Sequence, residues 1–209
     1  MKIILKNTKP NYVAEADVLA SAVYLEPLVQ FEKGKRYLIS AGSGKGKSSL
    51  FHFIYGSSKQ YSGEIIWEGL EAKDWDQIRQ QHLSYLFQDL KLFDELSAWE
   101  NLQVKNQLTQ YCSESKLDFY LESLGLSAHK HQTCKKLSLG QKQRLALIRV
   151  LCQPFDFLFL DEPFSHLDQA NIEKLSRLIE AELTEREAGL IISSLEPHSS
   201  LSIDQHLKL

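Results

Sequence analysis

The sequence predicts an α/β fold built on a largely parallel sheet. Short apolar runs of strand character alternate with segments whose apolar residues recur at helical spacing, as in strands joined by crossover helices. The run at residues 155–160 is apolar at all but one position, which is typical of a central strand covered on both faces. A glycine-rich stretch, residues 41–49, joins a predicted strand to a predicted helix. These observations together predict a strand–loop–helix unit inside one α/β domain.

The first part of the chain is predicted to be mainly β structure. Strands are expected at residues 2–6, 37–40, 63–69 and 83–87, where short apolar runs are bounded by glycines or polar turns. The stretch 7–20 is expected to be a loop around a Pro-Asn pair, and residues 23–31 are apolar but interrupted by Pro27. A buried helix is expected at residues 50–54, directly after the glycine-rich stretch.

Beyond the fourth strand the pattern changes from β to α. Ser97 and Glu100 form a predicted capping box at the start of one helix, and Gly125 ends a second helix over residues 115–124. Residues 89–151 are therefore expected to be a helical block between two β-rich parts. The remaining elements are a strand at residues 155–160, an amphipathic helix at residues 169–187 and a strand at residues 189–193.

Composition places the chain among ordinary globular proteins. Of its 209 residues, 43% are hydrophobic and 24% charged, enough to bury one core, or a core with an inserted subdomain. A net charge of −3 argues against bulk electrostatic binding to nucleic acid or anionic membrane. No apolar run reaches bilayer length, and Lys2 and Lys6 interrupt the first apolar residues, so we expect neither a span nor a signal peptide. Three cysteines without C-x-x-C spacing are expected to be free thiols rather than metal ligands or disulfides.

The glycine-rich stretch carries the first chemical signal. It matches the phosphate-binding pattern G-x-x-x-x-G-K-[ST], except that the first glycine is Ala41. Such a loop turns backbone N–H groups towards a nucleotide's phosphates at a helix N-terminus. Lys47 would reach the β- and γ-phosphates, and the Ser48 hydroxyl would be a ligand for Mg²⁺. The predicted nucleotide-binding residues here are Gly42, Ser43, Gly44, Lys45, Gly46, Lys47, Ser48 and Ser49. The alternative is a Gly/Ser/Lys surface loop that binds nothing.

Two adjacent carboxylates, Asp161 and Glu162, end the apolar run that begins at residue 155, and Pro163 follows them. Nucleotide hydrolysis needs one carboxylate near Mg²⁺ and one that polarises the attacking water. We therefore predict Asp161 as a metal ligand and Glu162 as a catalytic residue. The alternative is a strand that ends in polar surface residues.

The segment 137–144, Leu-Ser-Leu-Gly-Gln-Lys-Gln-Arg, opens the helix ahead of that strand. Ser138 and Gln141 form a predicted capping box, so a purely structural role is available. A helix N-terminus with the Ser138 hydroxyl and the Gly140 amide is also a second anion site. This motif, before a strand that ends in Asp-Glu-Pro, closely resembles the signature of ABC-type ATPases, the ATP-binding cassette proteins. The family pattern has glycine where this chain has Leu139.

The resemblance covers nearly the whole chain and implies the details of the fold. It implies a P-loop NTPase in which a RecA-like core, at residues 1–88 and 152–209, carries an antiparallel β subdomain. Residues 89–151 would be the inserted helical subdomain that contains the signature motif. The segment Ser165-His166-Leu167-Asp168 resembles the D-loop, which crosses the dimer interface in this family.

The resemblance also assigns further site residues. Gln88 resembles the Q-loop glutamine, so it is a predicted catalytic residue and a predicted metal ligand beside Ser48 and Asp161. The adenine is usually stacked by an aromatic residue after the first strand. Tyr12 is the candidate for this contact and Tyr24 a weaker one, although either tyrosine could instead be buried or simply exposed.

The implied function is that of an ATP- and Mg²⁺-binding transporter subunit. ATP held by the P-loop of one subunit would be capped by Ser138, Gly140 and Gln141 of another, in a homodimer or heterodimer that closes on binding and reopens on hydrolysis. Glu162 would orient or activate water, while Lys47, Mg²⁺ and Gln88 would stabilise the phosphoryl transition state. The chain would lie on the cytoplasmic face of the membrane and drive separately encoded permease subunits. The short C-terminus and the compact helical block favour small exporter-type cassettes, which resemble those of lipoprotein-releasing, macrolide-export and cell-division complexes. No nucleic-acid partner is expected.

The permease contact is expected near residues 88–99, from Gln88 to Trp99. This stretch supplies apolar residues for a docking surface, notably Phe93, Leu96 and Trp99. The alternative is that these side chains only pack the helical block.

One departure from the family pattern bears on turnover. The family usually has a histidine after the last strand that contacts the γ-phosphate, and this chain has Leu195 there. Leucine cannot donate a hydrogen bond, and His198 could substitute only if the loop folds back. The sequence therefore predicts nucleotide binding more firmly than rapid hydrolysis. The alternative function is an ATP-gated non-transport switch or structural tether with weak hydrolysis, to which Leu195, Leu139 and Ala41 point.

Overall fold

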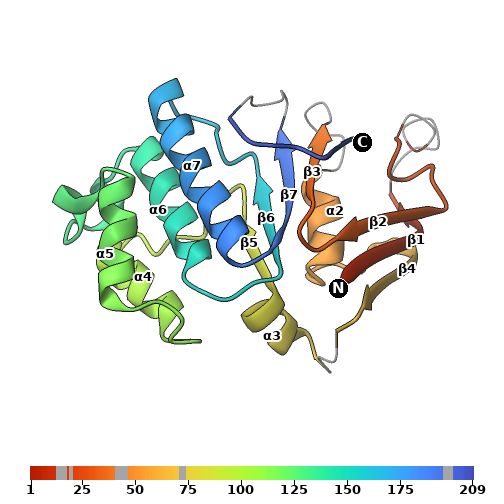
Figure 1. Ribbon diagram of the computed structural model, residues 1–209, viewed down its shortest axis with the longest axis horizontal. Helices are drawn as coiled ribbons and strands as arrows, with labels where there is room; N and C mark the ends of the chain where they lie inside the picture. Colours follow the sequence, from red (N-terminus) through yellow and green to blue (C-terminus); the bar gives the residue numbers. More distant parts are fainter. Residues whose placement is uncertain (13–17, 19–20, 41–46, 71–73, 195–199) are drawn as a thin grey trace.

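The computed structural model describes residues 1–12, 18, 21–40, 47–70, 74–194 and 200–209. Its strands are β1 (Lys2–Pro10), β2 (Leu28–Glu32), β3 (Arg36–Ser40), β4 (Tyr61–Glu68), β5 (Leu83–Leu86), β6 (Phe157–Asp161), β7 (Gly189–Ser194) and β8 (Gln205–Lys208). Its helices are α2 (Lys47–Ile54), α3 (Trp75–Gln77), α4 (Ala98–Asn106), α5 (Glu114–Ser123), α6 (Leu139–Leu151) and α7 (Gln169–Glu185), with short π or 3-10 turns at Ile78–His82, Ser127–His129 and Cys134–Lys136. Helices α4 to α7 lie on one side of the β5–β6–β7 strands, and α2 with the N-terminal strands lies on the other side (Figure 1).

Five strands form the predicted parallel sheet, in the order β5-β6-β7-β3-β8. The four neighbouring pairs are all parallel, so every strand ends at the same edge. β3 ends at Ser40, just before the glycine-rich stretch, β6 ends on Asp161 and β7 on Ser194, while Gln88 follows β5 by two residues. The topology therefore brings the predicted nucleotide-binding and catalytic segments to one edge of the sheet.

Three strands form a separate antiparallel sheet in the order β2-β1-β4, which confirms the predicted antiparallel subdomain. The predicted loop at residues 7–20 is wrong for its first four residues, because β1 continues to Pro10. Thr8 is buried there, and its hydroxyl donates to a carbonyl of β4. β2 begins at Leu28, directly after the Pro27 that interrupts that apolar run.

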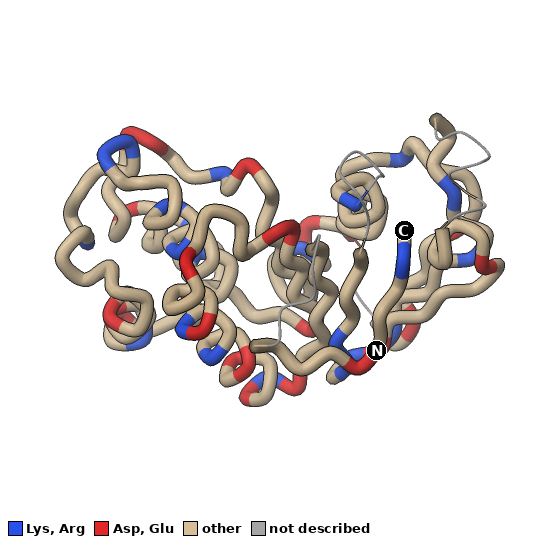
Figure 2. Tube along the Cα trace, turned by 90° about the horizontal axis from the view of Figure 1, so that it is seen from above, with Lys and Arg blue, Asp and Glu red and all other residues tan. Residues whose placement is uncertain are grey.

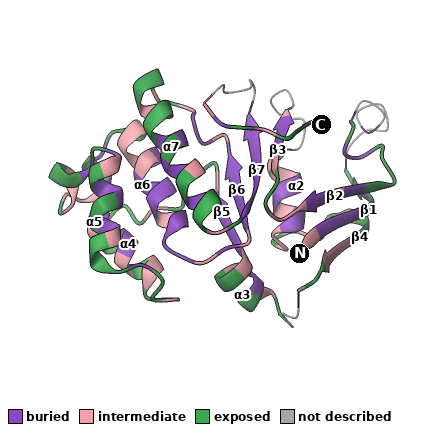
Figure 3. Cartoon of the chain, in the orientation of Figure 1, coloured by how far each residue is buried: buried purple, intermediate pink, exposed green. Residues whose placement is uncertain are grey.

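Two clusters of buried apolar side chains cover the two faces of the parallel sheet. Leu158 and Leu160 of β6 belong to the cluster shared with α4, α5, α6 and α7. Phe157 and Phe159 belong to the other cluster, which includes α2 and the antiparallel sheet. Side chains alternate between faces along a strand, so a strand covered on both sides must be apolar at successive positions. Figure 3 shows β6 and β7 as continuously buried strands between the two layers, which confirms the prediction of a central strand.

Helices α4, α5 and α6 lie together at one end of the molecule (Figure 1). The predicted capping box of α4 is present, since Glu100 Oε2 accepts from the Ser97 N–H at 2.7 Å. α5 begins at Glu114, within one residue of the predicted start. The division of the chain into a core and a subdomain at residues 89–151 stays a prediction. Among the described residues, no helix is both long and apolar enough to cross a membrane.

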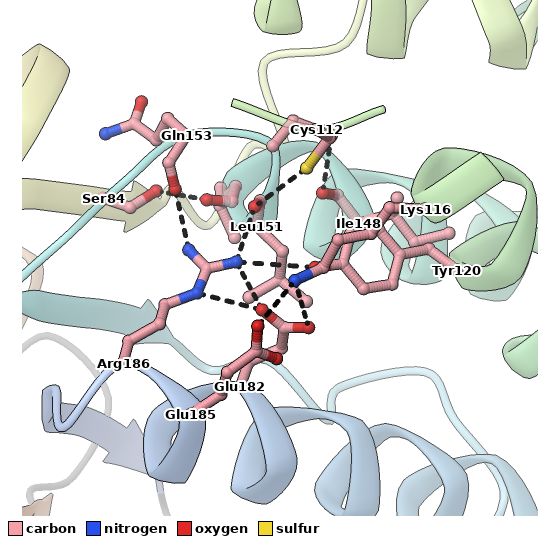
Figure 4. A network of polar contacts seen from close by, with 12 residues as sticks. Ser84, Cys112, Lys116, Tyr120, Ile148, Leu151, Gln153, Glu182, Glu185 and Arg186 are labelled. Atoms are coloured by element: carbon pink, nitrogen blue, oxygen red, sulfur yellow. Dashed lines mark hydrogen bonds and ion pairs between the residues drawn. The ribbon is translucent and has the colours of Figure 1, made fainter. Parts of the chain in front are cut away.

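A buried polar network ties α7 to this helical end (Figure 4). At the end of α7, Arg186 forms an ion pair with Glu182 and donates to the carbonyls of Leu151, 3.0 Å, and Gln153, 2.7 Å. Lys116 of α5 reaches the same carboxylate at 3.4 Å. The network therefore links α5, the end of α6 and α7 by charged hydrogen bonds in addition to apolar contacts. Elsewhere, basic and acidic residues are interspersed along the chain (Figure 2).

Candidate nucleotide-binding site

The first residues of α2 place two predicted ligands at the edge of the sheet. Lys47 is buried, with 6% of its surface exposed, and its Nζ lies 3.2 Å from Glu162 Oε1. Ser48 follows Lys47, and its hydroxyl donates to Asp161 Oδ2 at 2.6 Å. The predictions for Gly42, Ser43, Gly44, Lys45 and Gly46 lie outside the described residues. The described part of the glycine-rich stretch thus points its lysine and its serine at the two carboxylates.

Asp161 is a buried carboxylate with three hydroxyl donors around it. Besides Ser48, it accepts from Ser193 Oγ at Oδ1 and from Tyr85 OH at Oδ2, the latter at 3.4 Å. Burial, with the negative charge of Asp161 as a second cause, raises the pKa of Tyr85, so this phenol keeps its proton and remains a donor. Ser193 and Tyr85 were not predicted from the sequence. The parallel register offers one signal for Ser193, because it is the partner of Asp161 across β6 and β7.

Glu162 leaves the strand in a left-handed backbone conformation, with φ of +50°. Its N–H donates to the Ser193 carbonyl at 3.2 Å and faces Ser193 Oγ at 3.1 Å. Its carbonyl accepts from Ser165 Oγ at 2.9 Å. These hydrogen bonds offset the free-energy cost of the left-handed conformation, which is about 1–2 kcal/mol for any residue other than glycine. They hold the Glu162 carboxylate beside Lys47, where the sequence predicted a catalytic group.

Gln88 and Asp89 line both of two cavities at this edge. One, of about 360 Å³, is lined by Ser48, Asp161 and Gln88 together with aromatic residues of β5 and α2. The other, of about 510 Å³, is lined by Gln88 and Glu162 together with the start of α6 and His166. Hydroxyl, carboxylate and amide oxygens are the donors that Mg²⁺ prefers, so the residues lining the first cavity fit the predicted metal site. Gln88 itself lies on the exposed segment after β5, and its roles as metal ligand and catalytic residue stay predictions.

The signature segment caps α6 as predicted. The Ser138 N–H donates to Gln141 Oε1 at 2.8 Å, and Ser138 Oγ accepts from the Gln141 N–H at 3.3 Å. Gly140 lies against the D-loop segment, since a Cβ at this position would sit 3.2 Å from the His166 carbonyl oxygen. Leu139, where the family has glycine, is 49% exposed. Within the described residues, no hydrogen bond or ion pair joins the signature segment to Lys47 or Ser48, so the two predicted anion sites are separate in one chain.

The two tyrosine candidates for adenine stacking have different environments. Tyr12 is 55% exposed in the turn after β1, so its ring is available for stacking. Tyr24 is almost fully buried, and burial raises its pKa. The weaker candidate, Tyr24, is therefore wrong as a stacking residue, because no free ring face remains. Tyr12 stays a prediction, while Leu195 and His198 lie outside the described residues.

The chain is similar to known proteins both in sequence and in fold. A family model described as "ABC transporter" matches residues 27–165. The cytochrome c biogenesis ATP-binding export protein CcmA of Pasteurella multocida is 33% identical over 155 residues, which cover 74% of this chain and 72% of that protein. The thiamine import ATP-binding protein ThiQ of Histophilus somni is 33% identical over 162 residues, 76% of this chain and 75% of that protein. Both relatives are named as ATP-binding proteins of transport systems.

Two solved structures share the fold. A putative ABC transporter ATP-binding protein from Pyrococcus furiosus has a TM-score of 0.76 at 22% identity and covers 99% of this chain and 98% of its own. A bacterial ABC transporter cassette, determined as a dimer, has a TM-score of 0.72 at 22% identity and covers 91% and 87% of the two chains. These likenesses confirm the predicted P-loop NTPase fold.

Proposed function

We propose a mechanism for a chain that belongs to the ABC transporter family of ATP-binding proteins. The chain is the ATP-binding subunit of a transporter whose membrane components are separate chains. The observation that carries the mechanism is the cluster of Lys47, Ser48, Asp161 and Glu162 at one edge of the parallel sheet. At the N-terminus of α2, the Lys47 ammonium and the Ser48 hydroxyl face the two carboxylates. Phosphoryl transfer to water requires this arrangement.

The ion pair between Lys47 and Glu162 sets the order of events. Without nucleotide, the Lys47 ammonium contacts the Glu162 carboxylate. The β- and γ-phosphates of ATP attract the same ammonium more strongly, because they carry more negative charge. Glu162 is then free to accept a proton from the attacking water. Binding of ATP therefore prepares the carboxylate for hydrolysis.

The metal side of the site is formed by Ser48, Asp161 and Gln88. When bound, Mg²⁺ neutralises charge on the phosphate oxygens. Tyr85 and Ser193 keep the Asp161 carboxylate in a fixed orientation through their hydroxyl groups. Both donors are part of the sheet, so Asp161 needs little rearrangement when a ligand enters.

A second copy of the cassette completes the site. Ser138, Gly140 and Gln141 make no described contact with Lys47 or Ser48 of their own chain, and the N-terminus of α6 is exposed at Ser138 and Leu139. We place this exposed helix N-terminus on the phosphates held by a partner cassette, identical or related. Leu139 adds a side chain at this contact where the family has glycine, and Tyr12 stacks on the adenine.

The permease contact is formed mainly by Phe93. Its ring is 48% exposed, and its backbone is fixed by Asn101, whose side chain accepts from the Phe93 N–H at 2.9 Å and donates to the carbonyl at 3.0 Å. A rigidly held, exposed aromatic ring is a typical anchor for a protein partner. Leu96 and Trp99 are half-buried and Trp99 packs against the core, which favours the packing role for them. The chain would thus work at the cytoplasmic face of the membrane, on its permease.

Turnover is expected to be slow. Leu195 offers no hydrogen bond where the family places a histidine, and loss of one donor to the transition state lowers the rate by about 10²-fold or more. The transport relatives favour a transporter subunit over the switch or tether, and slow hydrolysis is compatible with either.

The test is ATP hydrolysis by the complex of this chain with its membrane subunits. We expect Mg²⁺-dependent release of phosphate that Glu162→Gln abolishes while ATP still binds, because the amide cannot accept the proton. An intact complex that binds ATP but turns over no faster than the Glu162→Gln complex would contradict the proposed ATPase function. Phe93→Ala should reduce co-purification of the membrane subunits without changing ATP binding.

A further inference from the structure

His129 contacts the signature segment, although no motif in the sequence marks it. It lies in the short 3-10 turn Ser127–His129, between α5 and α6, and its imidazole is half-buried. Its Nε2 lies 2.8 Å from Nε2 of Gln141, and its Nδ1 lies 2.7 Å from Oε1 of Gln132. Both ring nitrogens are therefore engaged, one of them by a residue of the segment that the proposed function places on a partner's phosphates.

Backbone groups fix the direction of these hydrogen bonds at both ends. At one end, Gln141 Oε1 accepts from the Ser138 N–H at 2.8 Å, so the amino group of the Gln141 side chain faces His129. At the other end, Gln132 Nε2 donates to the Lys136 carbonyl at 3.2 Å, so Oε1 of Gln132 faces His129. A backbone N–H can only donate and a carbonyl can only accept, so neither side-chain amide can be reversed without losing a hydrogen bond.

The imidazole of His129 then has a single form that fits both contacts. Its Nε2 must accept from the Gln141 amide, and its Nδ1 must carry the proton that is donated to Gln132. A protonated ring would place an N–H against the amide N–H of Gln141, and the other neutral tautomer would fail at both contacts. His129 is thus neutral with its proton on Nδ1, and it holds Gln141 with the carbonyl oxygen turned towards the helix cap.

The segment that carries His129 is itself fixed to the start of α4. The Ala98 N–H donates to the Gln132 carbonyl at 3.0 Å. The Trp99 N–H donates to the Lys130 carbonyl at 2.9 Å. The first N–H groups of a helix have no acceptor within that helix, so these two bonds also satisfy the N-terminus of α4. The imidazole therefore reaches α6 from a support that another helix holds in place.

We propose that His129 is a positioning residue for the signature segment, whose neutral imidazole orients Gln141 and so presets the N-terminal turn of α6 for a partner's phosphates. Gln141 Oε1 holds the Ser138 N–H and Ser138 Oγ holds the Gln141 N–H, so a residue that holds the amide also holds this turn. Donors that are already ordered bind an anion without the cost of ordering them. The inference rests on the proposed function, and His129 acts through Gln141 without touching the nucleotide.

The test separates the acceptor at position 129 from the bulk of the side chain. His129→Leu removes the acceptor, whereas His129→Gln offers a carbonyl oxygen to Gln141. In the complete complex, we expect the Leu variant to raise KM for ATP by about 5–10-fold, the effect of about one hydrogen bond, with kcat changed less than twofold. The Gln variant should recover most of that loss. The matched control His131→Leu changes an exposed histidine two residues away and should leave KM unchanged.

Two further measurements show whether His129 acts through Gln141. In a Gln141→Ala background, His129→Leu should cause no additional change in KM, because the contact that it removes is already absent. NMR of the full chain, labelled with ¹⁵N at histidine and measured without nucleotide at alkaline pH, should show a His129 ring protonated at Nδ1. The signal is assigned by its loss in the His129→Gln variant.

The proposal is overturned by a His129 ring protonated at Nε2, by a KM of His129→Leu within twofold of the wild type, or by a Gln variant as impaired as the Leu variant. Additive effects of His129→Leu and Gln141→Ala would overturn it as well. Failure of the proposed function is recognised separately, since the Glu162→Gln complex would then hydrolyse ATP as fast as the wild type, whereas the tautomer is measured without turnover.

Discussion

Replacement of Arg186 by methionine tests how strongly the buried network holds the helical end to α7. The Arg186 and Glu182 side chains are each about 5% exposed, and Arg186 Nε lies 2.9 Å from Glu182 Oε2. Among the described residues, the substitution leaves the buried Glu182 carboxylate with Lys116, 3.4 Å away, as its one cationic partner. It also removes the donors to the carbonyls of Leu151 and Gln153.

The expected loss follows from these contacts. Removing one partner of a buried ion pair costs about 3–5 kcal/mol, because the remaining charge stays out of water. Lys116 compensates part of this, while each carbonyl that loses its donor adds about 1 kcal/mol or more. We therefore expect Arg186→Met to lower the free energy of unfolding by about 3–5 kcal/mol. For a chain of this size that corresponds to a fall in Tm of roughly 10 °C.

The assay is urea unfolding followed by circular dichroism, with a matched control on the same helix. Arg177 and Glu173 have the same four-residue spacing on α7, but Arg177 is 81% exposed and the charged atoms lie 3.9 Å apart. Arg177→Met should therefore cost no more than about 0.5 kcal/mol. The double variant Glu182→Gln/Arg186→Met should be more stable than the sum of its single changes predicts, because no charge remains unpaired. Equal losses in Arg186→Met and Arg177→Met would refute the reasoning.

The remaining predictions concern turnover and acid stability. Leu195→His should raise kcat for ATP by about tenfold or more, since it adds a donor where the family has one. Phosphate release by the complete complex measures this, and an unchanged rate would contradict the expectation that Leu195 slows turnover. Burial alone would raise the pKa of Asp156, but hydrogen bonds from Lys33 and His82 outweigh it and lower the pKa. The stability from this carboxylate is therefore present above the unfolded pKa, near 4, and is lost as pH falls through the lower folded value. Asp156→Asn should be less stable than the wild type at pH 7, and urea unfolding at pH 3 should show a smaller difference; a difference that stays constant with pH would contradict this assignment.

The order of strands and helices along the chain was predictable because the main strands are covered on both faces. Such strands must be apolar at successive positions, and the run that becomes β6 shows this directly. Two of the strand segments that were missed show where this signal fails. β8 has only one buried residue, Leu207, and it pairs with β3 through backbone groups that leave no pattern in the sequence. Residues 7–10 extend β1 although they include an asparagine, a lysine and a proline, which have low strand propensity. Cross-strand pairing with β4 outweighs this local propensity.

The site was predictable only where a motif marks it. Lys47, Ser48, Asp161 and Glu162 stand at motif positions, and the structure brings them together. Ser193 carries no motif, although its hydroxyl and carbonyl contact both carboxylate residues. Its position depends on the register between β6 and β7, which is a property of the assembled sheet.

The conformation of Glu162 explains how two adjacent residues serve one site. In an extended strand, successive side chains point to opposite faces of the sheet, so Asp161 and Glu162 would point apart. The left-handed φ at Glu162 ends the extended conformation and turns its carboxylate to Lys47, while Asp161 contacts Ser48. Because Lys47 and Ser48 are neighbours at the start of α2, both carboxylates then face the same helix N-terminus. Ser193 stabilises this turn because its carbonyl accepts from the Glu162 N–H while its hydroxyl donates to Asp161. One residue of β7 therefore fixes the predicted metal ligand, Asp161, relative to the predicted catalytic carboxylate of Glu162.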